Sequence, residues 1–321
     1  MRKVLVTGAA GFVGSTLAEA LTSDSDVKVI GVDALTDYYD PAAKRQNLST
    51  LSERPNFQFV EADLNALDLS TLLDGVTEVY HQAGQPGVRS SWGEEFATYM
   101  AHNIQATQSL LEAAKSASQL KAFVYASSSS VYGDAERFPT EETDRPAPRS
   151  PYGVTKLAAE HLCSLYAANF GIPTVSLRYF TVYGPRQRPD MAFRRFLTAA
   201  VADETIHVYG SGEQIREFTH IHDIVRANLL AGETTVPAGT VINLSGGASV
   251  SVNETLDVIS DLVGRPLRIE RSGAVAGDVL RTGGSTQRAA ELLGWQAQVD
   301  IRAGLASELD WVLQTRWSPA A

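Results

Sequence analysis

The sequence predicts an α/β fold, a Rossmann-type doubly wound parallel sheet. Short apolar strands alternate with longer helical patterns through the first half of the 321 residues. A glycine-rich turn follows the first of these strands and opens a helix, and an aspartate ends the second strand. Strands separated by helices form βαβ units, and their right-handed crossovers place helices on both faces of a parallel sheet.

Six apolar runs define the expected strands of this sheet, at residues 3–6, 27–32, 57–61, 76–81, 120–126 and 174–178. Helical patterns separate them, most clearly at 13–21, 96–116 and 151–169. The last of these helices has a clear start, since Ser150 can cap its N-terminus and Pro151 suits its first turn.

The pattern loosens after residue 185. Short strands at 205–209 and 241–244 mix there with helices at 223–232 and 253–263. We therefore expect residues 1–185 to form the dinucleotide-binding Rossmann domain. Residues 186–321 should mainly form a smaller mixed α/β substrate-binding region, partly interleaved with the first.

Composition excludes several classes of function. A net charge of −10 offers no basic stripe to neutralise the phosphates of a nucleic acid. No apolar run approaches the ~20 residues of a membrane span. Cys163 is the single cysteine, so no internal disulfide is possible, and its apolar helical surroundings predict a buried thiol. Without a visible signal peptide, we expect a cytoplasmic protein that binds neither nucleic acid nor membrane.

The glycine turn has the spacing of a dinucleotide site. Gly8, Gly11 and Gly14 allow a tight turn, close approach of the backbone to a pyrophosphate, and close packing of helix on strand. The helix N-terminus then presents free N–H groups and its positive dipole end. Asp33 lies about 20 residues on, where a carboxylate binds ribose hydroxyls. It disfavours a 2′-phosphate, so NAD is expected rather than NADP, and Asp63 is a candidate contact for the adenine.

A tyrosine and a lysine are the candidate catalytic residues. Tyr152 and Lys156 are i and i+4 on a predicted helix and share a face, so the lysine cation should lower the pKa of the phenol. Ser128, in the run Ser127–Ser130 at the end of a strand, should hydrogen-bond the reacting oxygen. This set suits hydride chemistry at a secondary alcohol.

A cluster of His220, His222 and Asp223 suggests a metal site at first sight. Asp223 is better explained as the N-cap of the following helix, and we expect no metal.

Taken in their order along the chain, these motifs resemble those of the extended short-chain dehydrogenases/reductases, in the nucleotide-sugar epimerase and dehydratase group. They cover nearly the whole chain and include Arg178-Tyr179-Phe180 and the late Gly277-Asp278-Val279. The resemblance implies NAD as cofactor and a UDP-sugar as substrate. It also implies the following NAD-site residues: Gly8, Gly11, Phe12, Val13, Gly14, Asp33, Asp63, Leu64, Ala83, Gly84, Gln85, Asn103, Tyr152, Lys156 and Tyr179.

Three segments, at 33–44, 85–89 and 180–192, are similar to those of UDP-glucuronate 4-epimerases. Dehydratases of the family carry an Asp-Glu pair where this chain has Ser129 and Ser130, and decarboxylating relatives carry a glutamate at position 130. Serine hydroxyls can instead donate hydrogen bonds to a substrate carboxylate, and Arg188 can pair with it. The substrate residues so implied are Gly87, Val88, Arg89, Ser128, Ser129, Ser130, Tyr152, Thr181, Arg188, Val208, Tyr209, Arg216 and Asp278.

The activity so implied is NAD-dependent 4-epimerisation of UDP-glucuronate to UDP-galacturonate, through a transient 4-keto sugar and without decarboxylation. A UDP-glucose or UDP-N-acetylglucosamine 4-epimerase, a UDP-glucuronate decarboxylase and a catalytically silent dinucleotide sensor are the alternatives. Two departures stand out: Gln82 replaces a more common apolar residue, and Val275 replaces a polar residue that often helps to hold the diphosphate. Family members often form homodimers through two helices, here 96–116 and 151–169.

Overall fold

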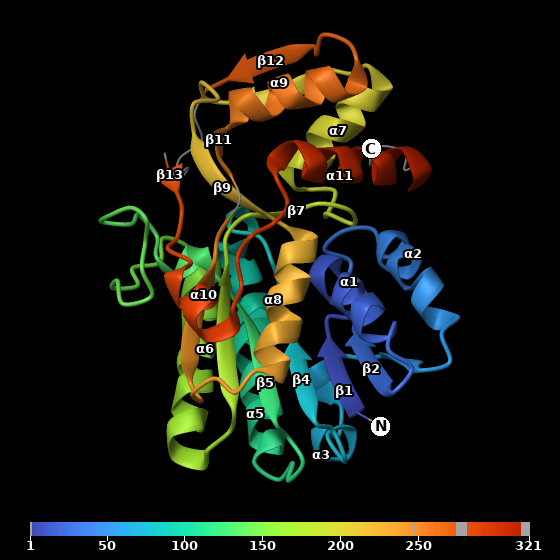
Figure 1. Ribbon diagram of the computed structural model, residues 1–321, viewed down its shortest axis with the longest axis vertical. Helices are drawn as coiled ribbons and strands as arrows, with labels where there is room; N and C mark the ends of the chain where they lie inside the picture. Colours follow the sequence, from blue (N-terminus) through green and yellow to red (C-terminus); the bar gives the residue numbers. More distant parts are fainter. Residues whose placement is uncertain (1, 247, 274–280, 316–321) are drawn as a thin grey trace.

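The central sheet has seven strands and all of them are parallel. In the computed structural model, which describes residues 2–246, 248–273 and 281–315, the strands lie in the order β10-β6-β5-β4-β1-β2-β3 (Figure 1). Every neighbouring pair is parallel, so the predicted doubly wound sheet is confirmed. The bounds are β1 (Arg2–Thr7), β2 (Val27–Asp33), β3 (Phe57–Glu61), β4 (Glu78–His81), β5 (Ala122–Ser128), β6 (Thr174–Tyr179) and β10 (Thr240–Leu244).

Helices cover both faces of this sheet. Successive strand residues point to opposite faces, so Val4 and Val6 of β1 pack with one group of helices and Leu5 packs with the other. The first group is α1 (Phe12–Leu21), α2 (Pro41–Ser52), α8 (Ile221–Glu233) and α10 (Gln287–Leu293), and the second is α3 (Leu69–Leu72), α5 (Ala106–Ala114) and α6 (Pro151–Phe170).

Local sequence signals explain how α6 begins and ends. Ser150 Oγ accepts a hydrogen bond from the Gly153 amide at 3.1 Å, and Pro151 occupies the first turn, as expected. The helix ends at Gly171, whose φ of 70° suits a residue without Cβ.

The helix expected at 96–116 is divided into three pieces: α4 (Phe96–Tyr99), the π-helix η4 (Met100–Gln105) and α5. The wider turn of a π-helix changes the direction of side chains and is frequent at functional sites. Single-turn 3₁₀ segments connect other elements, at η1 (Leu64–Ala66), η2 (Arg89–Ser91), η3 (Gly93–Glu95) and η5 (Ser129–Val131).

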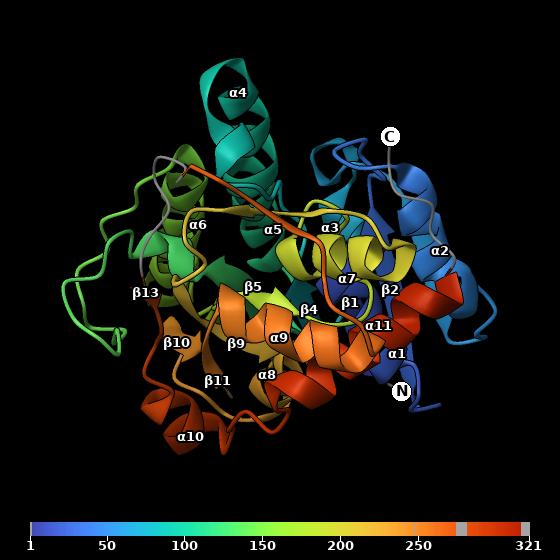
Figure 2. The same ribbon diagram turned by 90° about the horizontal axis from the view of Figure 1, so that it is seen from above.

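A second group of elements lies over the carboxyl ends of the central strands (Figures 1 and 2). We call it the C-terminal lobe. Its apolar core includes Phe193, Leu197, Ile259 and Leu305. It comprises the strands β7 (Val182–Tyr183), β8 (Ile206–Tyr209), β9 (Ile215–His220), β11 (Ala248–Ser251), β12 (Ile269–Ser272) and β13 (Arg281–Thr282), with the helices α7 (Ala192–Ala202), α9 (Val252–Val263) and α11 (Ile301–Thr315).

The chain passes between the sheet and the lobe more than once. Strand β10 pairs with β6 in the central sheet, and α8 packs on that sheet, although both follow residue 185. The division into a domain of residues 1–185 and a region of residues 186–321 stays a prediction. Among the described residues, none of the helices combines the length and the apolar character that a membrane crossing requires.

The expected N-cap of α8 is wrong. His220 caps this helix, and Asp223 lies in its first turn. The Asp223 carboxylate accepts hydrogen bonds from the amides of Gln298 and Val299 at 3.0 Å and pairs with Arg226 at 2.8 Å, so it joins α8 to a distant segment. Within the described ranges, His, Cys, Asp and Glu side chains form no group of three or more that could hold a metal ion.

Glu308 of α11 is a fully buried carboxyl group next to the loop that follows β7. Its Oε2 accepts a hydrogen bond from the Gly184 amide at 2.9 Å, while Oε1 has no hydrogen-bond partner. Burial raises the pKa of this carboxyl group to about 8, although the Gly184 amide and the Arg194 cation favour its charged form.

We therefore expect stability to fall as pH rises from about 5 to about 8. In this window an unfolded Glu308 releases its proton while the folded one keeps it, so the unfolded state binds fewer protons. Glu308→Gln keeps an uncharged acceptor for the Gly184 amide. Urea unfolding at several pH values should show that the free energy of unfolding of the variant rises relative to that of the wild type by a few kcal/mol across this window. A difference in the free energy of unfolding between variant and wild type that does not change with pH would contradict a raised pKa of Glu308.

Candidate functional site

A cavity of about 490 Å³ opens at the carboxyl ends of the central strands, where ligands bind in doubly wound sheets. The loops after β1 to β6 form its wall. Most of the residues predicted for the site line it: Gly8, Gly11, Phe12, Val13, Gly14, Asp33, Asp63, Leu64, Ala83, Gly84, Gln85, Gly87, Val88, Ser128, Ser129, Ser130, Tyr152, Lys156, Tyr179, Thr181 and Arg188.

The glycine turn has the geometry of a phosphate cradle. Gly8 has φ 68°, and a Cβ placed on Gly14 would lie 2.1 Å from the Gly8 carbonyl oxygen. Gly11 is the N-cap of α1 and offers no side-chain cap, so the first turn of the helix keeps amide groups for a ligand. A tight backbone turn at a helix N-terminus fits the pyrophosphate of a dinucleotide.

Asp33 lies at the end of β2 with its carboxylate fixed. Oδ1 accepts a hydrogen bond from the Leu35 amide at 2.8 Å, and Oδ2 accepts one from the Ala10 amide at 3.0 Å. The negative charge is thus held beside the glycine turn, where it fits ribose hydroxyls and opposes a 2′-phosphate.

The structure brings Tyr152 and Ser128 together. Tyr152 is in the first turn of α6, Ser128 ends β5, and both side chains line the cavity. Burial raises the pKa of the phenol, while the nearby Ser128 hydroxyl and the positive charge of Arg188 act in the opposite direction. A base at Tyr152 therefore depends on the Ser128 hydroxyl and on nearby positive charge.

Lys156 lies on the same face of α6 and also lines the cavity. Its Nζ donates a hydrogen bond to the Ala126 carbonyl at 2.8 Å and lies 5.1 Å from the centre of the Tyr125 ring. Burial lowers the pKa of this amine to about 8. The Tyr152 pKa is raised on balance, because burial outweighs the favourable groups, and the expected lowering of this pKa by the Lys156 cation stays a prediction.

A group of hydroxyls and one guanidinium surrounds the Tyr152 end of the cavity: Ser128, Ser129, Ser130, Thr181 and Arg188. Ser128 Oγ accepts a hydrogen bond from the Ser130 amide at 3.1 Å, which fixes the start of η5. The Arg188 side chain is 19% exposed and makes two hydrogen bonds of 2.9 Å to Asp190. This group can bind an anion through charge-assisted hydrogen bonds.

Charge is distributed unevenly along the cavity. The carboxylates among its described lining residues are Asp33 and Asp63, which follow β2 and β3. Ser128 and Thr181 follow β5 and β6, on the other side of β1 and β4 in the sheet. The end that holds Tyr152 and Arg188 therefore has no carboxylate among its described lining residues, and the carboxylate next to it, that of Asp190, is paired with Arg188.

Some predicted residues lie elsewhere. Asn103 is behind the wall of the cavity: its Oδ1 accepts from the Gln85 amide at 2.7 Å, and its Nδ2 donates to the Gln85 carbonyl and to Thr155 Oγ1. It positions the loop after β4 instead of lining the site. The others that do not line the cavity are Arg89, Val208, Tyr209 and Arg216, while Asp278 and Val275 lie outside the described residues.

Arg89 and Tyr209 form a contact of their own, with the guanidinium carbon 5.2 Å from the ring centre. This contact joins the loop after β4 to β8 of the C-terminal lobe. Arg216 and Val208 belong to β9 and β8 in the lobe, so the lobe, and not the cavity as described, holds the residues expected to bind uridine and diphosphate.

Sequence reasoning missed other lining residues. Lys44 is nearly buried, donates to the Thr36 carbonyl and hydroxyl at 2.8 and 3.0 Å, and lies over the Tyr39 ring. Gln82 was noted only as a departure; it donates to Asn228 and accepts from the Tyr179 hydroxyl. Only the Tyr-Tyr pair within 33–44 and the unusual Gln82 offered a signal. Tyr38, Tyr39, Lys44, Gln82 and His102 all line the cavity.

The fold and the site define a dinucleotide-binding α/β protein with a tyrosine and a serine next to the cofactor cradle. Residues 4–245 match the NAD dependent epimerase/dehydratase family. The chain belongs to this family.

Individual proteins and a solved structure resemble this chain along nearly its whole length. The chain is 42% identical over 313 residues to a Bacillus subtilis protein named "Uncharacterized UDP-glucose epimerase YtcB", covering 97% of this chain and 98% of that protein. It is 35% identical to a UDP-glucuronate 4-epimerase of Thermodesulfobacterium geofontis, covering 96% and 95%. The crystal structure of UDP-glucuronic acid 4-epimerase from Bacillus cereus, in complex with UDP-glucuronic acid and NAD, matches with TM-score 0.94 and 42% identity, over 98% of this chain and 99% of that one.

The glycine cradle gives a direct prediction. Gly14→Ala places a Cβ against backbone atoms of Gly8 and Ala9, which cannot move away without opening the turn. Dinucleotide affinity, measured by calorimetry, should fall at least about tenfold, a loss of about 1.4 kcal/mol. Gly273→Ala is the control, because nothing lies within 4 Å of a Cβ there. Unchanged affinity in Gly14→Ala would show that the turn does not need close packing.

Proposed function

We propose that this protein converts UDP-glucuronate to UDP-galacturonate by NAD-dependent 4-epimerisation, without loss of CO₂. One observation carries the proposal: Tyr152 and Ser128 share a cavity end with Arg188 and further hydroxyls, and no described lining residue there is acidic. A hexose whose C4 faces Tyr152 can thus present a carboxylate to Arg188. The similarity to the Bacillus cereus enzyme supports the same substrate.

The cofactor-binding roles follow from the geometry of the cradle. The amides at the start of α1 would hold the pyrophosphate, Asp33 the adenosine ribose, and Asp63 and Leu64 the adenine. Tyr152 and Lys156 would hold the other ribose and the nicotinamide end. When bound, NAD⁺ accepts hydride from C4 of the sugar and returns it to the opposite face.

The chain's own residues move the proton. The Tyr152 oxygen takes the proton of the C4 hydroxyl and later returns it, while Ser128 hydrogen-bonds the same sugar oxygen as its charge changes. Lys156 is buried and its pKa is about 8, so it still carries its proton near neutral pH and its charge favours the phenolate. Bound substrate shields these groups from water.

The carboxylate needs restraint because the 4-keto form of glucuronate is a β-keto acid. It loses CO₂ only when the bond from C5 to the carboxylate aligns with the ketone π system. Hydrogen bonds from Ser129, Ser130 and Thr181, with the Arg188 charge, would hold the carboxylate away from that alignment. A glutamate at position 130 would instead repel it.

A UDP-glucose 4-epimerase is the second candidate. The name of the Bacillus subtilis relative supports it, and the chemistry at C4 would use the same Ser128, Tyr152 and Lys156. UDP-N-acetylglucosamine epimerisation and decarboxylation of UDP-glucuronate are further alternatives. A neutral sugar would present no carboxylate to Arg188, and a decarboxylase would lose the carboxylate of UDP-glucuronate as CO₂.

Incubation with UDP-glucuronate, UDP-glucose and UDP-N-acetylglucosamine in turn, followed by separation of the sugar nucleotides, tests the proposal. UDP-galacturonate should appear from the first, with at least about tenfold higher kcat/KM than for a neutral sugar. Tyr152→Phe should lower kcat at least about 100-fold and leave UDP affinity unchanged, since it removes only the proton acceptor. Conversion of a neutral sugar alone would overturn the assignment to a uronate.

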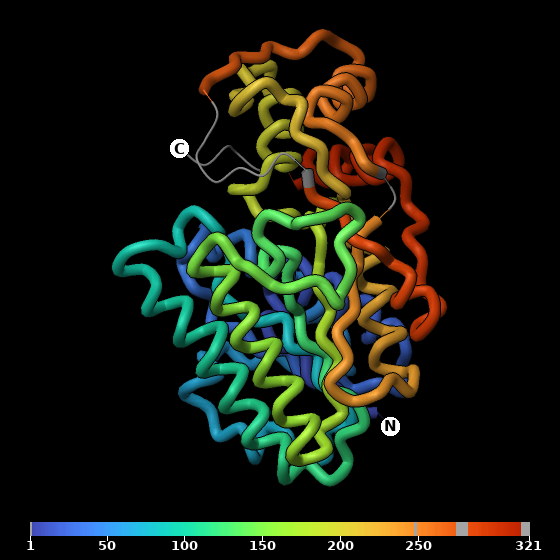
Figure 3. The backbone as a smooth tube through the Cα atoms, turned by 90° about the vertical axis from the view of Figure 1, so that its left-hand side faces the viewer, coloured from blue at the N-terminus to red at the C-terminus, as the bar shows by residue number. Residues whose placement is uncertain are grey.

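We also propose that the protein is a cytoplasmic homodimer. Helices α5 and α6 run side by side on one face (Figure 3), and exposed apolar side chains lie along α6 and the neighbouring π-helix. Met100, Val154 and Leu165 are 44%, 46% and 54% exposed. Two such helix pairs can bury these side chains as a four-helix bundle.

Leu165→Asp should therefore convert the dimer into a monomer, because it places a charge in the proposed bundle. Sedimentation velocity at micromolar concentration checks this. Leu313→Asp on α11 is a matched control, since Leu313 is 52% exposed but lies on the C-terminal lobe. A wild-type protein that sediments as a monomer, or a dimer that survives in Leu165→Asp, would count against this interface.

A further inference from the structure

The loop at residues 184–191 joins β7 to α7 and carries Arg188 to the cavity; we call it the Arg188 loop. It begins with a tight turn in which the Gln187 amide donates to the Gly184 carbonyl at 3.1 Å. Gln187 also spans the base of the loop, donating to the Val182 carbonyl and accepting from the Arg194 amide. Gln187 thereby ties the loop to both of the elements that it joins, β7 and α7.

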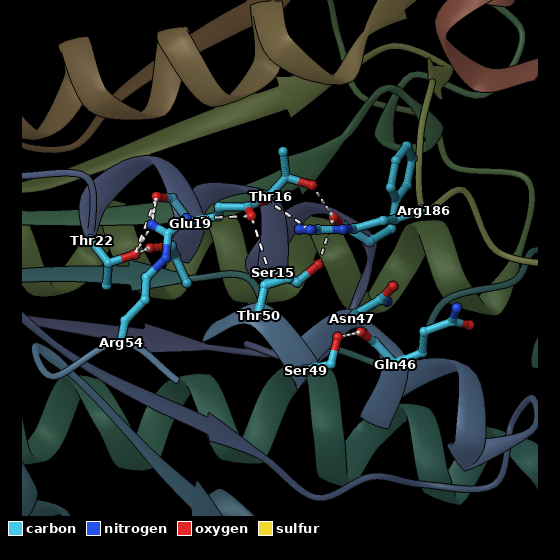
Figure 4. A network of polar contacts seen from close by, with 12 residues as sticks. Ser15, Thr16, Glu19, Thr22, Gln46, Asn47, Ser49, Thr50, Arg54 and Arg186 are labelled. Carbon is cyan, nitrogen blue, oxygen red and sulfur yellow. Dashed lines mark hydrogen bonds and ion pairs between the residues drawn. The ribbon is translucent and has the colours of Figure 1, made fainter. Parts of the chain in front are cut away.

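Arg186 ties the other side of the loop to the helix that opens at the glycine turn. Its Nη2 lies 2.8 Å from Glu19 Oε2 of α1, and its side chain is only 15% exposed (Figure 4). Arg186 and Glu19 are 167 positions apart in the chain, so this contact connects two distant segments. This contact directly links α1, the helix that begins at the glycine turn, to the Arg188 loop.

Glu19 is itself held in place from the side opposite Arg186 (Figure 4). Arg54 Nη2 approaches Glu19 Oε1 at 3.5 Å, and Arg54 Nη1 donates to the Glu19 carbonyl and to Thr22 Oγ1 at 2.6 Å. Thr50 of α2 lies 3.4 Å from the same Oε1. Because α1, α2 and the segment before β3 share this carboxylate, Glu19 gives Arg186 a rigid partner.

The tight turn from Gly184 to Gln187 accounts for the backbone conformation of Arg186. Arg186 is the third residue of this turn and follows Pro185, and its φ of 71° is in the left-handed region that this position can take, at a cost of order 1 kcal/mol for a non-glycine residue. The ion pair with Glu19 adds a side-chain contact that holds this turn against α1. Loss of the pair would release the turn from α1 and would let the Arg188 loop move.

We propose that the Glu19–Arg186 ion pair is a positioning pair that holds the Arg188 loop against α1, while Asp190 orients the Arg188 guanidinium within the loop. Gln187 ties the loop to β7 and α7, and Arg186 ties it to α1. Arg188 lies two residues after Arg186. This inference rests on the proposed function, in which Arg188 binds the substrate carboxylate. It assigns substrate selectivity in part to a residue on the cofactor-binding helix.

Binding without turnover tests the pair. In a Tyr152→Phe background, calorimetry gives the affinities for UDP-glucuronate, UDP-glucose and UDP. The protein should prefer UDP-glucuronate to UDP-glucose, and Glu19→Gln or Arg186→Gln should reduce that preference at least about fivefold, with the affinity for UDP changed less than about twofold. Glu61→Gln is the control, since it breaks the exposed Arg45–Glu61 pair on the same domain.

Turnover gives a second measurement that a purely structural role would not move. In the active protein, Glu19→Gln should raise KM for UDP-glucuronate more than it lowers kcat, and should raise the fraction of turnovers that release CO₂. The conservative variant Arg186→Lys, which keeps a cation beside Glu19, should keep part of the preference that Arg186→Gln loses, which shows that the pair, and not folding alone, is responsible.

The outcomes separate the two proposals. A parent protein with no preference for UDP-glucuronate would overturn the proposed function, and the role of the pair with it. A parent with a clear preference that Glu19→Gln and Arg186→Gln both keep would overturn the positioning pair alone. Equal losses of affinity for UDP and both sugars, with a lowered melting temperature, would also overturn it, because they indicate general destabilisation.

Discussion

The buried ion pair between Glu160 and Arg178 is the interaction on which the active-site geometry depends. Tyr152, Lys156 and Glu160 follow one another at intervals of four on one face of α6. Glu160 accepts two hydrogen bonds from Arg178 of β6 and one from Ser127 of β5, at 2.6–2.9 Å, with both charged side chains at most 4% exposed. Removal of one partner from such a pair typically costs about 3–5 kcal/mol, so α6 is firmly fixed to the strand that ends in Ser128.

This fixed helix lets one cavity serve two chemically different purposes. The side of the sheet at β2 and β3 presents the carboxylates of Asp33 and Asp63, and the side at β5 and β6 presents hydroxyls and Arg188. The switch point between β1 and β4 lies between the two sides. In the proposed function the nicotinamide and the sugar would meet between the two sides, next to Tyr152. Substrate selectivity can therefore change on one side while the cofactor side stays the same.

The sequence predicted those parts of the structure that are encoded locally. The glycine turn, the Ser150 cap, and the shared face of Tyr152 and Lys156 each depend on residues a few positions apart. It did not predict contacts between distant segments. Nothing near Asn103 signals that its amide binds the Gln85 backbone instead of a ligand, and nothing near Glu19 signals a partner at Arg186. The upward shift of the Tyr152 pKa was also missed, since burial is a property of the folded chain.

Strand β10 has a consequence for how the chain can be divided and how it folds. Its backbone completes the hydrogen bonding of β6, yet in the sequence it lies between two parts of the C-terminal lobe. The sheet therefore closes only after residue 244 has been synthesised, and the pairing of β6 with β10 contributes a long-range step to folding. A chain that ends near residue 185 would leave β6 with an unpaired edge and would lack α8, which covers apolar side chains of the sheet. The two parts of the molecule thus share one folding unit.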